Sequence, residues 1–317
     1  MNIIKKPHDK FFKETLSDIE TTKDFMINYL PKDLISVIDL ENLIPEKDSY
    51  IEKELEETFS DLLFKTSING EEGYIYFLFE HKSYLPSRIS LQLLKYMINI
   101  WEQKTNKEKA ATLPIIIPLV VYHGKSKWNT SKTLGGIIEG IETMPESIKK
   151  YIPDFEYILY DLSPYGDEEI KGNAKLRIFL EILKSIFNED FEKFMDTLVR
   201  ALETLEKLNN QEKGIDYFET FIRYIMNARE DINLTDVYEV VKNISLERSE
   251  DIMTIAEQLI KEGMEKGMEK GMEKGILEGK RKTAKNMLKL GLTVEQVVDA
   301  AELSIEEVIQ LKKEIEN

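Results

Sequence analysis

The sequence predicts an α/β core followed by a C-terminal region built only of helices. Helical patterns alternate with extended apolar runs in the first half of the chain, whereas strand patterns stop near residue 167. The 317 residues, 42% of them hydrophobic, suffice for a buried core and about two domains. We therefore expect a core over residues 1–167, a helical extension over 168–230 and a charged helical tail over 231–317.

The first elements of the core follow from local periodicity. Residues 10–30 are amphipathic with a helical period, which predicts a helix. Residues 59–68 and 74–80 are strand-like, and Asn69-Gly70 between them is a strong signal for a hairpin turn. The second of these strands is apolar on both faces, which is typical of a central strand.

A helix and two further strands complete the predicted core. Apolar residues recur at helical spacing from Ile89 to Trp101. Residues 113–122 form an apolar run typical of a buried strand, and residues 155–162 predict another strand. Helices and strands in this order indicate one α/β core.

The tail contains a four-residue repeat, Gly-Met-Glu-Lys, in three copies over residues 263–274. On a helix each glycine costs about 1 kcal/mol relative to alanine, and glutamates four residues apart repel one another. Two interpretations stay open: a linker or isolated helix, or a helix whose glycine face lets a partner helix approach closely. After the repeat, two capping-box patterns predict short helices, at Thr293 with Gln296 and at Ser304 with Glu307.

Composition excludes several classes of function. The chain has no cysteine, which excludes disulfides, thiol catalysis and zinc–thiolate sites. It has no apolar run long enough for a membrane helix and no signal-peptide pattern, so we expect a cytoplasmic protein without a membrane partner. The net charge is −16, yet residues 81–135 carry nine basic and two acidic residues. This segment is either a surface for a polyanion or a solvated face without a partner.

Two carboxylates and an ammonium group fall on the predicted hairpin. If the turn is centred between Gly70 and Glu71, Asp61 directly faces Glu80 across the two strands. Opposed like charges destabilise a hairpin unless a cation lies between them, and carboxylate oxygens suit a hard divalent ion. Lys82 follows two residues later and falls on the same strand face. A metal held there would activate a phosphodiester, whereas a shift of register would leave unrelated strand-edge charges.

These residues resemble the PD-(D/E)XK nuclease signature, with Asp61 as its Asp and Glu80-x-Lys82 as its (D/E)-x-K. Residues 7–230 are similar to the Rpn family of recombination-promoting nucleases, also described as YhgA-like putative transposases. The wider match lies in four segments: Phe59-Ser60-Asp61-Leu62-Leu63, Glu80-His81-Lys82-Ser83, the helix from Arg88 to Trp101 with Gln92 and Tyr96, and residues 113–124.

The resemblance implies a restriction-endonuclease-like mixed sheet with flanking helices. It also implies DNA cleavage that depends on Mg²⁺ or Mn²⁺ and is linked to recombination or transposon-like activity. Asp61 and Glu80 would be the metal ligands, and Lys82 would be the third catalytic residue. This chain departs from the common pattern at two positions, because many relatives carry Gln at the place of Lys82 and Ser60 stands where the signature has Pro.

The expected partners are DNA and further copies of the chain, joined through the helical tail. Four polar residues near the proposed site are candidate DNA contacts: Arg88, Gln92, Lys125 and Lys127. We expect no organic cofactor. The alternative function is a nuclease-fold protein without turnover, which binds DNA or acts in assembly through its oligomerising tail.

Overall fold

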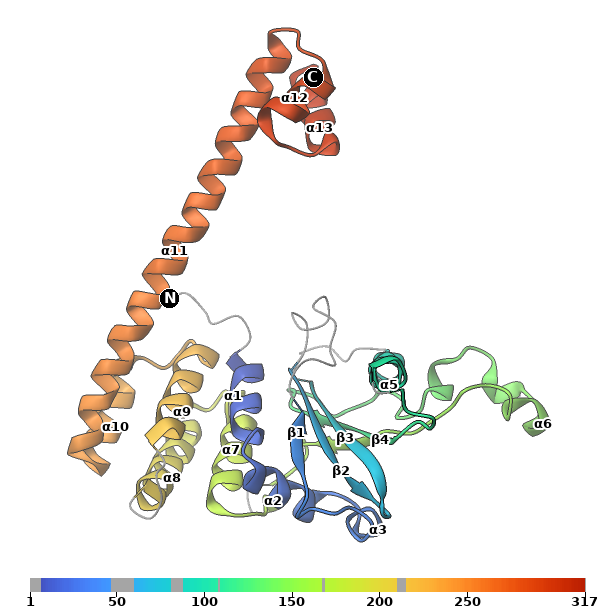
Figure 1. Cartoon of the computed structure of the whole chain (residues 1–317). Helices are drawn as coiled ribbons and strands as arrows, with labels where there is room; N and C mark the ends of the chain where they lie inside the picture. The colour runs from blue at the N-terminus through green and yellow to red at the C-terminus, as the bar shows by residue number, and fades with distance from the viewer. Residues whose placement is uncertain are drawn as a thin grey trace. The chain divides into compact units, whose positions relative to one another are not determined.

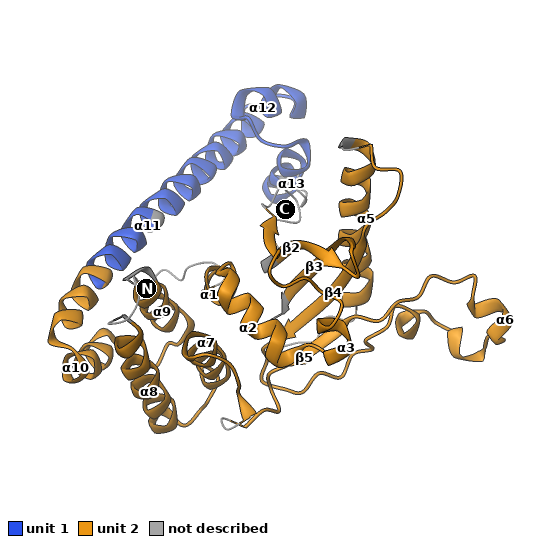
Figure 2. Cartoon of the chain, turned by 60° about the horizontal axis from the view of Figure 1, so that its bottom comes forward, with its two compact units in different colours: residues 1–3, 256–317 blue, residues 4–255 orange. Residues whose placement is uncertain are grey.

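The computed structural model describes residues 7–46, 60–80, 88–107, 109–166, 169–209 and 215–316 (Figure 1). The chain divides into two compact units (Figure 2), of which the larger holds residues 4–255 and the smaller holds residues 256–317. Among the described residues, no helix combines the length and the apolar character needed to cross a bilayer.

A five-stranded mixed sheet lies at the centre of the larger unit. Its strands are adjacent in chain order; β1, β2 and β3 pair antiparallel, whereas β3, β4 and β5 pair parallel. The strands are β1 (Ile44–Glu46), β2 (Ser60–Ile68), β3 (Glu71–Glu80), β4 (Ile115–Tyr122) and β5 (Ile158–Asp161). The central place of β3 confirms the prediction from its apolar sequence, since every residue from Tyr74 to Leu78 is buried.

The turn between β2 and β3 contains two residues. Asn69 and Gly70 both have positive φ, at 52° and 85°. This combination is typical of the type I′ turn, whose twist matches that of a hairpin. Ile68 therefore pairs directly with Glu71, and the two strands share one continuous register.

Helices cover both faces of the sheet (Figure 1). On one face, α5 (Ile89–Lys107) packs its apolar side against β2, β3 and β4. On the other lie α1 (Pro7–Leu16) and α2 (Ile19–Tyr29), with the ring of Phe25 5.8 Å from that of Phe77. The single helix expected over residues 10–30 is thus two helices, because Asp18 is extended and starts α2 as its N-cap.

A layer of helices packs outside α1. The ring of Phe11 stacks on Tyr224 at 4.2 Å and lies 5.2 Å from Phe179, so α1 is held between the sheet and this layer. The layer contains α7 (Ala174–Ser185), α8 (Phe191–Asn209), α9 (Ile215–Ala228) and α10 (Leu234–Ile244). Shorter helical segments of the larger unit are α3 (Lys32–Ile35), η2 (Gly135–Ile137), η3 (Ile141–Thr143) and α6 (Glu146–Lys149).

The smaller unit has a core of its own. It contains most of α11 (Leu246–Lys289) together with α12 (Val294–Ala301) and α13 (Ile305–Glu316). Ala284, Val297 and Val308 are fully buried where these three helices meet. Both predicted capping boxes are confirmed: Thr293 and Gln296 bond reciprocally at the start of α12, and Ser304 and Glu307 do so at the start of α13.

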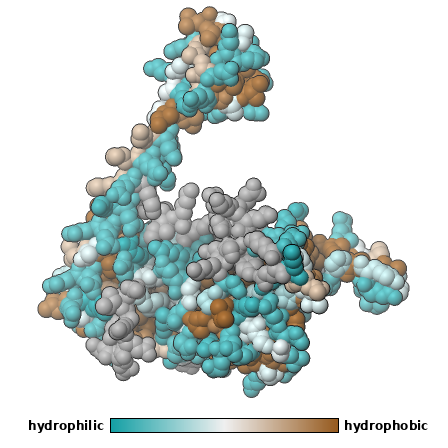
Figure 3. Space-filling model, in the orientation of Figure 1, coloured by the Kyte–Doolittle hydropathy of each residue, from teal (hydrophilic) through white to brown (hydrophobic). Residues whose placement is uncertain are grey.

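The Gly-Met-Glu-Lys repeat lies inside α11, which is a continuous helix of 44 residues. Figure 3 shows pale brown apolar residues among hydrophilic ones along this helix. Met264, Met268 and Met272 are 71%, 78% and 67% exposed, so the described part of the chain does not cover them. The mixed sheet with flanking helices and the helical C-terminal region confirm the expected fold class and are consistent with a nuclease-like α/β fold.

Candidate active site

Asp61 and Glu80 lie on neighbouring strands, but they are not directly opposite each other. Asp61 pairs with Leu78 across the hairpin, and Glu80 lies two residues farther along β3. The expected direct pairing is wrong because the turn is centred between Asn69 and Gly70, one residue earlier than the prediction assumed. Since residues alternate between faces along a strand, positions 61, 78 and 80 belong to the same face of the sheet. Positions 61 and 80 are diagonal neighbours, and such neighbours are about 7–8 Å apart.

Position 80 lies at the edge of the sheet where the parallel strands end. It pairs with Tyr122, the last residue of β4, and Tyr122 pairs in turn with Asp161, the last residue of β5. In open α/β sheets, ligands commonly bind in the crevice beyond the carboxyl ends of parallel strands. Glu80 is therefore in a place where catalytic side chains are common.

Gln92 lies near the amino terminus of α5, on the side of the helix that faces the sheet. Its neighbours Ile89 and Leu93, and Tyr96 one turn later, are all buried in the cluster between α5 and the strands. The side-chain nitrogen of Gln92 is buried and has no hydrogen-bond partner among the described residues. A buried amide without an acceptor costs about 1–3 kcal/mol, and functional sites are a common reason for such a cost.

The candidate DNA contacts of the basic segment are exposed. Arg88 directly precedes α5, so it lies at the same helix end as Gln92. Lys125 and Lys127 follow β4 and are exposed beyond the strand-end edge that contains position 80. The structure thus places Lys125 and Lys127 at that edge, and it places Arg88 at the start of the helix that covers the same face.

Two other lysines of the basic segment pair with glutamates, Lys104 in the interior and Lys132 at the surface. Lys104 is only 3% exposed, and its Nζ lies 3.3 Å from Oε1 of Glu72. Lys65 also contacts Glu72, at 2.5 Å, and its hydrogen bond is the main reason why the pKa of Glu72 is lowered. Lys132 pairs with Glu156 at 3.1 Å. The surface available to a polyanion is therefore smaller than the sequence count indicates.

Part of the predicted site lies outside the described residues. Lys82 belongs to the segment 81–87, which lies outside the described residues. For Asp61 and Glu80 the structure describes the backbone but not the side chains. Among the side chains that are described, no three His, Cys, Asp or Glu residues form a group able to hold a metal. The donor set of Asp61 and Glu80 consists of carboxylate oxygens, which fits Mg²⁺ or Mn²⁺ by its chemistry.

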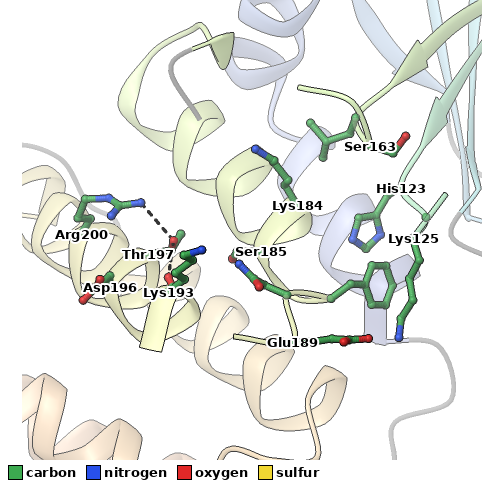
Figure 4. A pocket seen from close by; sticks show the side chains of 14 residues that line it. His123, Lys125, Ser163, Lys184, Ser185, Glu189, Lys193, Asp196, Thr197 and Arg200 are labelled. Atoms are coloured by element: carbon green, nitrogen blue, oxygen red, sulfur yellow. Dashed lines mark hydrogen bonds between the residues drawn. The ribbon is translucent and has the colours of Figure 1, made fainter. Parts of the chain in front are cut away.

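A group of polar residues that local sequence did not indicate lines a pocket at the same edge of the sheet (Figure 4). Only Lys125 among them was a candidate. Lys184 comes from the end of α7, and Lys193 and Arg200 come from α8. Their one local signal is that Lys193 and Arg200 are seven residues apart and thus share a helix face.

Comparison with known proteins supports a common origin over most of the chain. The family model "Putative transposase, YhgA-like" matches residues 6–213. Recombination-promoting nuclease RpnD of Escherichia coli O157:H7 is 28% identical over 253 residues, which cover 80% of this chain and 94% of RpnD. Recombination-promoting nuclease RpnA of Escherichia coli K12 is 27% identical over 297 residues, which cover 93% of this chain and 97% of RpnA.

A further relative carries a different description. The inactive recombination-promoting nuclease-like protein RpnE of Escherichia coli K12 is 26% identical over 298 residues, which cover 94% of this chain and 95% of RpnE. No solved structure shows a significant match. Because the family model covers well over half of the sequence, the chain belongs to the YhgA-like putative transposase family, which includes the Rpn recombination-promoting nucleases.

Proposed function

We propose that this protein is a metal-dependent endonuclease that hydrolyses phosphodiester bonds in DNA and acts in recombination or a transposon-like process. The relatives named recombination-promoting nucleases support this reaction class. The observation that carries the proposal is the register of the hairpin. It puts positions 61 and 80 on one face of two neighbouring strands, where the parallel strands end.

In this proposal Asp61 and Glu80 hold Mg²⁺ or Mn²⁺. Diagonal positions on neighbouring strands are close enough for two carboxylates to share one cation. The observed register is therefore compatible with a metal site formed by Asp61 and Glu80. When bound, the ion would supply Lewis-acid activation of a phosphoryl oxygen and of the attacking water. Lys82 would offset the charge that builds on the phosphate during attack.

The surrounding residues would position the DNA. The buried amide of Gln92 would donate to an oxygen of the phosphate or of the attacking water, which would satisfy its hydrogen bond. Arg88, Lys125 and Lys127 are exposed and would contact the backbone phosphates. Such contacts would offset the repulsion between DNA and a chain of net charge −16.

Plasmid nicking tests the proposal with Asp61→Asn and Glu80→Gln, each assayed with Mg²⁺ and with EDTA. Glu71→Gln is the matched control, because Glu71 is an exposed carboxylate at the other end of β3. We expect wild type and control to nick the plasmid only with Mg²⁺. The two site variants should lose more than the roughly 10–100-fold that changes around a metal site usually cost. Equal nicking by all four proteins, or nicking in EDTA, would contradict the proposal.

The alternative is a nuclease-fold protein that binds DNA or acts in assembly without turnover. The similarity to RpnE, which is described as inactive, favours this alternative. The exposed methionines of α11 are consistent with a tail that joins copies of the chain. Two measurements separate the functions. DNA binding without any cleavage by the intact chain supports the alternative, whereas cleavage that survives removal of residues 256–317 with an altered oligomeric state makes the tail an assembly element of a nuclease.

A further inference from the structure

A pocket of about 580 Å³ lies beyond the ends of β4 and β5, within the larger unit. The strand-end residues His123 and Ser163 form one side, and the last turn of α7 and the first half of α8 form the other (Figure 4). This volume lies within the range of about 300–1,000 Å³ that is usual for small-ligand sites. The pocket is thus large enough for a whole nucleotide and larger than a phosphate ion requires.

The pocket is positively charged although the chain is acidic. Four cationic side chains and two carboxylates, Glu189 and Asp196, line it. The cations are Lys125, Lys184, Lys193 and Arg200. The carboxyl end of α7, at Ser185, and the amino end of α8, at Phe191, both lie near the pocket. Their helix dipoles have opposite signs there and offset each other. The attraction for an anion therefore comes from the side chains.

The cations gather at one end of the pocket. Figure 4 shows Lys184, Lys193 and Arg200 around one hollow, with Lys125 at the other end beside Glu189. Lys193 and Arg200 share a face of α8, and Arg200 donates a 3.1 Å hydrogen bond to Oγ1 of Thr197. Lys193 lies 3.5 Å from Asp190 at the rim and is otherwise exposed. A phosphate at this end would meet several donors with opposite charge.

The other end has an aromatic floor. His123 is 2% exposed and its ring stacks on Phe187, with centroids 4.7 Å apart and planes at 20°. Nε2 of His123 donates to the carbonyl of Leu183, and His8 packs on the same ring at 5.2 Å. Phe187 is only half-buried and lines the pocket. A fixed aromatic ring beside a pocket is a surface on which a nucleobase can stack.

We propose that this pocket binds one nucleotide, with the phosphate at Lys184, Lys193 and Arg200 and the base at Phe187. The nucleotide is either free or part of a DNA strand. His123 directly follows Tyr122, the register partner of Glu80, so the pocket and the candidate metal site share one edge of the sheet. The DNA source therefore rests on the function proposed above, whereas binding of a free nucleotide does not.

Calorimetric titration of the full-length protein with AMP in EDTA tests the pocket without any cleavage. We expect Lys193→Gln with Arg200→Gln to weaken AMP binding by at least about tenfold, because two charge-assisted contacts are lost. The conservative pair Lys193→Arg with Arg200→Lys should recover most of the affinity. Lys207→Gln is the matched control, since Lys207 is an exposed lysine on α8 outside the pocket. Phe187→Leu should weaken AMP binding but leave binding of inorganic phosphate unchanged.

A labelled DNA duplex, also in EDTA, identifies the source of the nucleotide. If the double variant loses DNA affinity and AMP competes with the duplex, the pocket holds a nucleotide of the strand. If only AMP binding falls, the ligand is a free nucleotide. Asp61→Asn should bind AMP as the wild type does, so a failure of the nuclease proposal would leave this result intact. The inference is overturned if AMP does not bind the wild type, or if AMP binds the double variant and the Lys207 variant equally well.

Discussion

At the scale of single residues, the candidate site contains a buried polar group, that of Gln92, whose hydrogen-bonding capacity is not satisfied by the fold. The side-chain nitrogen of the half-buried Gln92 is covered and has no acceptor among the described residues. By contrast, the buried Lys104 is neutralised by Glu72 at the other end of the hairpin. A polar group that reduces stability without a compensating contact is more common at functional sites than elsewhere.

Replacement of Gln92 by leucine tests this interpretation. Leucine has a similar volume and needs no hydrogen bond, so we expect the free energy of unfolding to rise by about 1 kcal/mol. Cleavage should fall at least about tenfold, as expected for a residue around a metal site. Denaturant unfolding and plasmid nicking measure the two effects. Gln103→Leu, later on α5, is the comparison variant. A variant of Gln92 that is less stable and fully active would show that the amide is structural.

At the scale of elements, α11 departs most from local propensity. Its repeated glycines lie in a continuous helix, although each glycine destabilises a helix by about 1 kcal/mol relative to alanine. A Cβ atom added at Gly271 or Gly275 would meet nothing within 4 Å. Packing inside the chain therefore does not require glycine at these two positions. The two interpretations of the repeat, an isolated helix or an oligomerising helix, remain distinguishable by experiment.

The substitutions Gly271→Ala and Gly275→Ala make this distinction. For an isolated helix, each should stabilise the smaller unit by about 0.5–1 kcal/mol, with no change of oligomeric state. For a helix whose glycines allow close approach of a second copy, the added methyl groups should weaken self-association instead. Circular dichroism melts give the first quantity, and light scattering across a concentration series gives the second.

At the scale of the whole molecule, charge is distributed unevenly. The chain carries a net charge of −16, while Arg88, Lys125, Lys127 and the cationic pocket gather on the larger unit. An acidic protein that binds DNA must do so through a limited patch, because the remaining surface repels the phosphates. Binding should therefore be weak at high ionic strength and depend on few residues.

The salt dependence of DNA affinity measures this patch. With three to six phosphate contacts, log K should fall against log salt with a slope of roughly −3 to −5. Lys127→Gln should reduce the steepness by about one, whereas Lys261→Gln, an exposed lysine of the smaller unit, should leave it unchanged. Anisotropy titrations in EDTA over a range of salt give both slopes. Equal slopes for wild type and Lys127→Gln would remove Lys127 from the interface.

Most elements of the core, and their order, can be predicted from local sequence, although β1 and the break between α1 and α2 were not. Strand patterns predicted β2, β3, β4 and β5 near their observed bounds, and the apolar runs of β3 and β4 are typical of strands that are buried on both faces. The capping boxes and the Asn69-Gly70 turn could be predicted because each depends on interactions between near neighbours in the sequence. The resemblance to a nuclease family likewise rested on short segments of sequence.

How these elements meet depends on tertiary packing, which local sequence does not specify. The position of the turn centre decides that Asp61 pairs with Leu78 and not with Glu80, although the strand pattern is the same in both registers. Lys104 looked like a surface charge until the fold placed it against Glu72. The pocket combines strand ends with residues of α7 and α8, far apart in the chain. Local patterns record which face of an element is apolar, but not which other element covers it, so a site built across several elements appears only when they pack.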